Sequence, residues 1–132
     1  MIAYYQKFVN TTNGDCWRTC IASILEIPQL EVPNFVTEGD DDYWMVAYKW
    51  LDKRDIRIAH TTQFKEAKEK SDYAFMIASG PSKSFPGFKH CVIVDLKNQI
   101  VHDPNPANKR LDEIECYEYF RQTKYWDGTE RE

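Results

Sequence analysis

The chain has 132 residues, of which 42% are hydrophobic and 14% aromatic, and its formal net charge is −4. This length and apolar content suit one compact core, so we expect a single domain over residues 1–132. A slightly acidic chain without a dense Lys/Arg block excludes the usual nucleic-acid and anionic-membrane surfaces.

The amino-terminal residues predict a short strand and no export signal. Residues 3–8 read as the strand, and MIAYYQKFVN lacks a basic start followed by an apolar run. No segment approaches the ~18 apolar residues that a membrane-spanning helix needs. We therefore expect a soluble, unexported, cytoplasmic protein without a membrane partner.

Residues 16–26 predict a helix that begins at Cys16, directly after the turn TTNGD. Pro28 and Pro33 follow it and forbid its continuation. Because most of its faces are apolar, we expect the rest of the fold to wrap this helix. Its clearly polar members are Arg18, Thr19, Ser23 and Glu26.

The middle of the chain predicts further helices and strands. Acidic residues 38–42 favour the start of a second helix, and its apolar face recurs at helical spacing in Trp44, Ala47, Tyr48 and Leu51. Later elements follow in chain order: a strand near 56–59, a polar helix near 62–70, a buried strand at 73–79, a loop at 80–88 and a β-hairpin at 90–104.

The hairpin brings a histidine and an aspartate to one face of the sheet. If residues 97–98 form a two-residue turn, Asp103 shares the face of His90, whereas His102 falls opposite Ile93 and faces away. His90 and Asp103 are then diagonal neighbours about 7 to 8 Å apart at the backbone, within reach of an imidazole and a carboxylate. A turn one residue longer or shorter would reverse this parity.

Four cysteines without a secretion signal indicate free thiols in a reducing compartment. Cys20, Cys91 and Cys116 fit the role of small buried hydrophobes. A zinc site built from Cys16, Cys20 and a histidine is disfavoured, because CxxxC lacks a second paired half. We therefore expect no metal and no cofactor.

Cys16, His90 and Asp103 have the side-chain types of a nucleophile, a general base and an orienting carboxylate. A helix amino terminus and a neighbouring imidazolium can lower a thiol pKa from about 8.5 into the range of roughly 3.5 to 7.5. Asp103 would hold the tautomer of His90 and favour its charged form. The three residues together favour a catalytic triad over three unrelated structural positions.

The segments GDCWRTCIASIL, HCVIVD and IVHDP resemble the papain-like cysteine peptidases. The resemblance is closest to the bacteriocin leader peptidase domain of some ABC exporters and to its small stand-alone phage and bacterial relatives. It runs from about residue 4 to residue 112, and its other shared positions are Gln6, Gly14, Ile27 with Pro28, and Val32 with Pro33.

This resemblance implies an α+β fold in which a central helix carries the nucleophile and packs on an antiparallel sheet. It implies hydrolysis of a peptide, isopeptide or other amide through a thioester, with Cys16 as nucleophile, His90 as base and then acid, and Asp103 as orienter. The implied oxyanion donors are the Cys16 backbone amide and the Gln6 side chain. Asn10 is the alternative to Gln6, because papain-like enzymes usually place a glutamine six positions before the cysteine.

Trp17 stands where the exporter peptidases usually have a small residue, which indicates a reshaped cleft. We expect Trp17, Gly87 and Phe88 to contact a peptide or protein substrate, since the loop before His90 is a candidate lid. Two alternatives stay open. One is a non-catalytic binding protein, such as a phage inhibitor of a host protein, and the other is an acyltransferase that uses the same triad.

Overall fold

The computed structural model describes residues 1–7, 15–35, 43–81, 89–105 and 111–123. Its helices are α1 (Cys16–Leu25), the 3-10 helix η1 (Gln29–Glu31), α3 (Tyr43–Asp52) and α4 (Phe64–Lys70). Its strands are β1 (Ile56–Thr61), β2 (Phe75–Pro81), β3 (Lys89–Asp95), β4 (Ile100–His102) and β5 (Cys116–Gln122). The sheet order is β1-β5-β2-β3-β4, and every neighbouring pair is antiparallel. The expected α+β class is confirmed.

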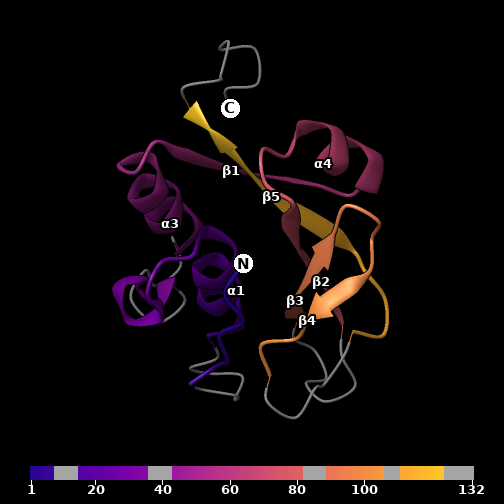
Figure 1. Ribbon diagram of the computed structural model, residues 1–132, viewed down its shortest axis with the longest axis horizontal. Helices are drawn as coiled ribbons and strands as arrows, with labels where there is room; N and C mark the ends of the chain where they lie inside the picture. The colour runs from indigo at the N-terminus through magenta and orange to yellow at the C-terminus, as the bar shows by residue number, and fades with distance from the viewer. Residues whose placement is uncertain (8–14, 36–42, 82–88, 106–110, 124–132) are drawn as a thin grey trace.

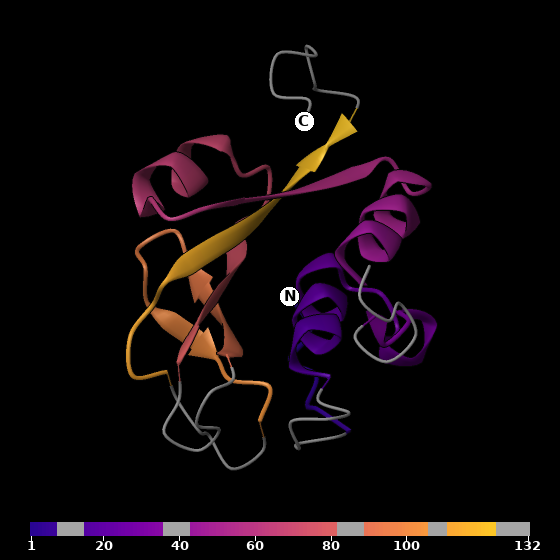
Figure 2. The same ribbon diagram turned by 180° about the vertical axis from the view of Figure 1, so that it is seen from behind.

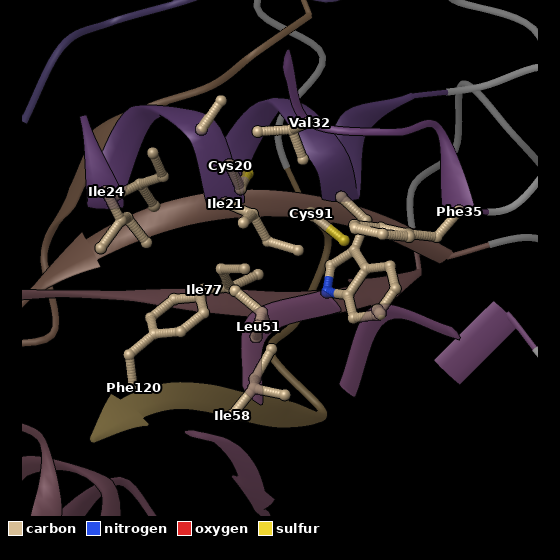
Figure 3. Packing of buried hydrophobic residues seen from close by; sticks show 14 residues of the cluster. Cys20, Ile21, Ile24, Val32, Phe35, Leu51, Ile58, Ile77, Cys91 and Phe120 are labelled. Atoms are coloured by element: carbon tan, nitrogen blue, oxygen red, sulfur yellow. The ribbon is translucent and has the colours of Figure 1, made fainter. Parts of the chain in front are cut away.

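Helices cover both faces of the sheet, with α1 and α3 on one face and α4 on the other (Figures 1 and 2). Buried side chains form two clusters, the α1 core between the sheet and helices α1 and α3, and the α4 core between the sheet and α4. Side chains of β3 alternate between them, because Cys91 and Ile93 pack in the α1 core whereas Val92 and Val94 pack in the α4 core. Figure 3 shows Cys91 beneath α1, on the same side as Ile77. β3 is therefore buried on both faces.

The helix predicted at residues 16–26 is confirmed as α1. It ends where Glu26 takes a left-handed conformation with φ 57°, and the Glu26 N–H donates to the carbonyl of Ala22. Cys20 and Ile21 are fully buried, and the helix packs on β2 and β3. Within the described part of the chain, no helix has both the length and the apolar character needed to cross a membrane.

The strand predicted at residues 3–8 is wrong for residues 3–7, and residue 8 lies outside the described residues. The backbone N–H groups of this segment donate hydrogen bonds to residues in different elements, and not to a single neighbouring strand. The Tyr4 N–H donates to Ser23 Oγ on α1 at 3.1 Å, and the Gln6 N–H donates to the carbonyl of Pro104 at 2.8 Å. Because these partners lie on a helix and a loop, no continuous strand ladder forms.

The predicted elements of the middle of the chain are confirmed with adjusted bounds as α3, β1, α4 and β2. On α3, Ala47 and Leu51 are fully buried and Trp44 and Tyr48 are partly buried, as the helical spacing predicts. The acidic residues 38–42, expected to begin this helix, lie outside the described residues.

The β3–β4 hairpin forms, but its predicted two-residue turn is wrong. The Asp95 N–H donates to the Gln99 carbonyl, which leaves three residues, 96–98, in the loop. A β-bulge then shifts the register, since Ile93 pairs with His102 while Val94 pairs with Ile100. The longer turn and the bulge each reverse the parity, so the predicted pairing of His102 with Ile93 is still correct.

β5 lies between β1 and β2, although it comes last in sequence among the strands that the structure describes. The segment that leads into β5 runs close to β2. There, Gly80 of β2 pairs with His90 of β3. A Cβ at Gly80 would collide with the backbone carbonyl oxygen of Glu113. Glycine is therefore required next to His90 so that the segment before β5 can pack there.

Candidate active site

Cys16 is the first residue of α1, at the helix end where backbone N–H groups favour negative charge. The preceding residue, Asp15, is buried, and its carboxylate accepts the Lys7 N–H at 3.2 Å and lies 3.7 Å from Arg18 Nε. These contacts offset the negative charge that Asp15 places next to the thiol. Cys16 itself is only partly buried, in contrast to Cys20 and Cys91, which are buried.

His90 and Asp103 form the predicted pair. His90 Nε2 lies 2.7 Å from Asp103 Oδ1, and the His90 residue is only 2% exposed. Asp103 Oδ1 also accepts the Asn105 N–H at 2.9 Å, which holds the carboxylate in place after β4. Because Asp103 occupies Nε2, the other ring nitrogen, Nδ1, is available to exchange a proton with a thiol.

The surroundings of Cys16 and His90 favour the charged form of both groups. A hydrogen bond from the Cys91 side chain is the largest influence on the Cys16 thiol; burial opposes it, and the hydrogen bond and charge of His90 add to it. Together they lower the pKa of Cys16 from 9.0 to about 5. Burial disfavours the charged imidazole, but hydrogen bonds to Asp103 and Cys16 raise the pKa of His90 from 6.5 to about 9. Cys16 and His90 therefore form a thiolate–imidazolium pair between about pH 5 and pH 9.

Cys91 is a member of this site that the sequence interpretation missed. It is buried, as predicted, but its thiol and its backbone N–H both hydrogen-bond to the Cys16 sulfur. Donation to Cys16, together with burial, raises the pKa of Cys91 well above 9.0. The position next to His90 at the start of β3 was the one available signal in the sequence.

Glu118 is a second group that sequence reasoning missed. It lies on β5, is 7% exposed, and its Oε2 accepts the Trp17 indole Nε1–H at 2.8 Å. Burial raises the pKa of Glu118 to about 7; the hydrogen bond from Trp17 opposes this shift and the nearby Cys16 charge adds to it. A carboxyl group that titrates near neutral pH therefore lies within electrostatic range of the candidate nucleophile.

Trp17, expected to contact substrate, is 6% exposed. Its ring stacks on Trp44 with centroids 5.3 Å apart and meets Phe35 edge-on at 5.7 Å. With its indole N–H bonded to Glu118, Trp17 forms part of the core behind Cys16. Gly87 and Phe88, the other expected substrate contacts, lie outside the described residues.

Gln6 lies between the two halves of the candidate site. Its own N–H is bonded to Pro104, next to Asp103, while the N–H of the following residue, Lys7, is bonded to Asp15, next to Cys16. Its side-chain Oε1 is buried. The alternative oxyanion donor, Asn10, lies outside the described residues.

The four cysteines carry free thiols. Among the residues that the structure describes, no group of three or more His, Cys, Asp or Glu side chains is arranged to hold a metal ion. Comparisons of the chain with protein-family models, with curated proteins and with solved structures found no match.

Proposed function

We propose that this protein is a thiol hydrolase with a papain-like fold that cleaves a peptide, isopeptide or other amide bond. The observation that carries the proposal is the placement of Cys16 at a helix amino terminus, in contact with a histidine that Asp103 holds at 2.7 Å. The side chains that we propose as nucleophile, base and orienting group form one connected set, which supports thiol-dependent acyl transfer.

The proposed reaction begins with attack of the Cys16 thiolate on the substrate carbonyl carbon. The Cys16 backbone N–H and the Gln6 side-chain amide stabilise the resulting oxyanion. The His90 imidazolium then protonates the leaving amine from Nδ1, which leaves a thioester on Cys16. Neutral His90 next removes a proton from water, and the hydroxide that forms at the thioester carbon releases the acid and restores the thiolate.

Asp103 contributes by orientation and charge. Its carboxylate accepts the Nε2–H of His90, which directs Nδ1 toward Cys16 and stabilises the imidazolium. Because the pKa of Cys16 is lowered to about 5 and that of His90 is raised to about 9, we expect activity to be highest between these two values.

The first test is the pH dependence of iodoacetamide alkylation at each cysteine, read by peptide mass spectrometry. In the wild type, Cys16 should react fastest, with an apparent pKa near 5. His90→Ala should raise this pKa toward the ordinary value, because it removes a hydrogen bond and a positive charge. His102→Ala is the matched control, since this second strand histidine bonds to the Tyr4 carbonyl and does not contribute to the pKa shift of Cys16.

The second test measures acylation with p-nitrophenyl acetate, followed by hydrolysis of a mixed peptide library. A burst of p-nitrophenol with an acetyl group on Cys16 supports the thioester step. Alkylation of Cys16 no faster than that of Cys116, unaffected by His90→Ala and without an acylation burst, would contradict the proposed function. That result would favour the binding-protein alternative.

A further inference from the structure

Two thiols meet at the candidate site, and the proposed hydrolysis uses only one of them as nucleophile. Cys16 begins α1, and Cys91 is the third residue of β3, the strand against which α1 packs. Both belong to the α1 core, and the Cys91 side chain hydrogen-bonds to the Cys16 sulfur. Figure 3 shows Cys91 on the side of the sheet that faces α1.

We propose that Cys91 is a resolving cysteine: peroxide oxidises Cys16, and the two residues then join in a reversible disulfide. This inference rests on the reactive Cys16 thiolate of the proposed function. The disulfide would block the nucleophile while preventing its further, irreversible oxidation. Cys16 and Cys91 would thus form a site of reversible oxidation within the candidate active site.

Cys16 is the thiol that peroxide attacks, for reasons of charge and access. It is partly exposed, and it stands at a helix amino terminus with an imidazolium beside it. Cys20 and Cys91 are buried, and burial favours their neutral thiol form. Neutral buried thiols react slowly with peroxide, so oxidation should be selective for Cys16.

The position of each remaining cysteine leaves Cys91 as the partner. Cys20 lies one turn along the same helix, where Cβ atoms are about 5 to 6 Å apart, whereas a disulfide needs about 3.5 to 4.5 Å. Cys116 pairs with Ser79 on β2, and Ser79 pairs in turn with Cys91 on β3. Cys116 is therefore two strands, or about 10 Å, from Cys91. Because the Cys16 sulfur contacts Cys91, Cys116 is also too far from Cys16 for a disulfide.

The proposed chemistry balances with peroxide as the only oxidant. The Cys16 thiolate attacks one peroxide oxygen, the O–O bond breaks, and hydroxide leaves, so the sulfur loses two electrons and becomes a sulfenic acid. The Cys91 sulfur then attacks the Cys16 sulfur, the S–O bond breaks, and the departing hydroxide takes the Cys91 proton to form water. A dithiol reductant restores both thiols.

The test treats the reduced full-length protein with hydrogen peroxide, blocks the remaining thiols with N-ethylmaleimide and maps tryptic peptides. Cleavage after Lys and Arg separates the cysteines, which fall in peptides 8–18, 19–49, 90–97 and 111–121. We expect a cross-linked peptide 8–18 with 90–97, lighter than the sum of its parts by two hydrogens. Dithiothreitol should restore both peptides and the fast alkylation of Cys16.

Cys91→Ser separates the resolving role from the hydrogen bond, because serine keeps a hydroxyl donor but cannot form a disulfide. In this variant, Cys16 should reach the irreversible sulfinic acid about tenfold faster than in the wild type. Cys116→Ser is the matched control and should still form the cross-link. Circular dichroism of each variant confirms that the fold is retained before the oxidation rates are compared.

The outcomes separate this inference from the proposed function. If the wild type and Cys91→Ser reach the sulfinic acid at the same rate, or if Cys16 joins Cys20 or Cys116, the resolving role is wrong even when the p-nitrophenyl acetate burst persists. If the 8–18 to 90–97 cross-link forms but no burst occurs, the thiol pair stands and the hydrolase proposal fails.

Discussion

The first two turns of α1 carry the same side chain in opposite chemical states. Cys16 is partly exposed, meets His90 and Cys91, and has a pKa lowered to about 5. Cys20, one turn later, is 0% exposed, and burial raises its pKa well above 9.0. The two share a helix and a residue type, so the difference comes from the helix end and from the strand residues that face each thiol.

This contrast shows that a helix amino terminus alone does not account for the reactive thiol. The first turn meets polar groups from β3 and β5, including the Glu118 carboxyl that accepts the Trp17 indole N–H. The second turn lies among apolar side chains of the same sheet, such as Ile77 (Figure 3). Changing the polar partners should therefore alter the pKa and reactivity of the Cys16 thiol and leave those of Cys20 unchanged.

The largest effect is expected for Asp103→Asn, which should raise the pKa of Cys16 and reduce its reactivity, so that this thiol comes closer to Cys20. An amide in place of the carboxylate no longer stabilises the imidazolium and can bind the wrong tautomer of His90. We expect acylation by p-nitrophenyl acetate to slow by about 10²–10⁴-fold. The acylation rate and the alkylation profile of Cys16 measure this change.

Asp95→Asn is the matched control for that change. Asp95 lies on the same hairpin and caps its turn by accepting the N–H groups of Lys97 and Gln99, which an asparagine oxygen can also accept. Its acylation rate should equal that of the wild type. Equal rates in Asp103→Asn and Asp95→Asn would show that the Asp103 charge has no part in activating Cys16.

The next largest effect is the pH dependence of stability in Glu118→Gln. The pKa of Glu118 is raised from 4.5 to about 7, so between these values the folded state keeps a proton that the unfolded state has lost. The contribution of Glu118 to the free energy of unfolding therefore falls by about 3 kcal/mol as the pH rises through this window. In Glu118→Gln, this decrease in the free energy of unfolding should be absent. Urea unfolding at a pH below the window and at one above it measures the difference.

Glu66→Gln tests the sign of that effect. Glu66 lies on α4, away from the thiols, and hydrogen bonds to Thr61 and Lys70 lower its pKa. Its contribution to stability is present above pH 4.5 and is lost as the pH falls through the lowered value. Because Cys16 also titrates inside the Glu118 window, with a pKa of about 5, the effect of Glu118 is read as the difference between the wild-type and Glu118→Gln profiles. A Glu118→Gln profile parallel to that of the wild type would contradict the raised pKa.

The smallest effect is expected for Cys20→Ser, which should alter stability without altering the site. A hydroxyl in this fully buried position should reduce the free energy of unfolding by about 1–3 kcal/mol. The apparent pKa of Cys16 alkylation should stay the same. Cys116→Ser serves as the control, because Cys116 is only partly buried and its sulfur already contacts the Ser79 hydroxyl at 2.9 Å. A large shift in Cys16 reactivity in Cys20→Ser would mean that the two turns are coupled.

Local patterns predicted most elements but not their arrangement. The apolar spacing of α1 and α3 and the period of the strands are local properties, so those elements follow from the residues. The strand at residues 3–7 was predicted wrongly, because its hydrogen-bond partners come from Ser23 and Pro104, far along the chain. The position of β5 between β1 and β2 is also a non-local pairing that no local pattern specifies.

The pairing of His90 with Asp103 shows how a correct prediction can depend on an incorrect step. The predicted turn was one residue too short, and the bulge at the pair Ile93/Val94 compensated for it. The turn length and the bulge both belong to the pairing of β4 with β3. The distance of 2.7 Å between the two side chains is therefore a tertiary result.

Capping, periodicity and strand alternation act over a few residues, so local patterns are enough to predict that a thiol begins an apolar helix and that a histidine and an aspartate lie on one hairpin. Which groups face that thiol depends on how the elements pack. The hydrogen bond from Cys91, the buried Glu118 carboxyl and the contrast between Cys16 and Cys20 all require the packing of α1 on the sheet. Charge states at such a site depend on burial and on partners distant in sequence, and both exist only in the folded chain.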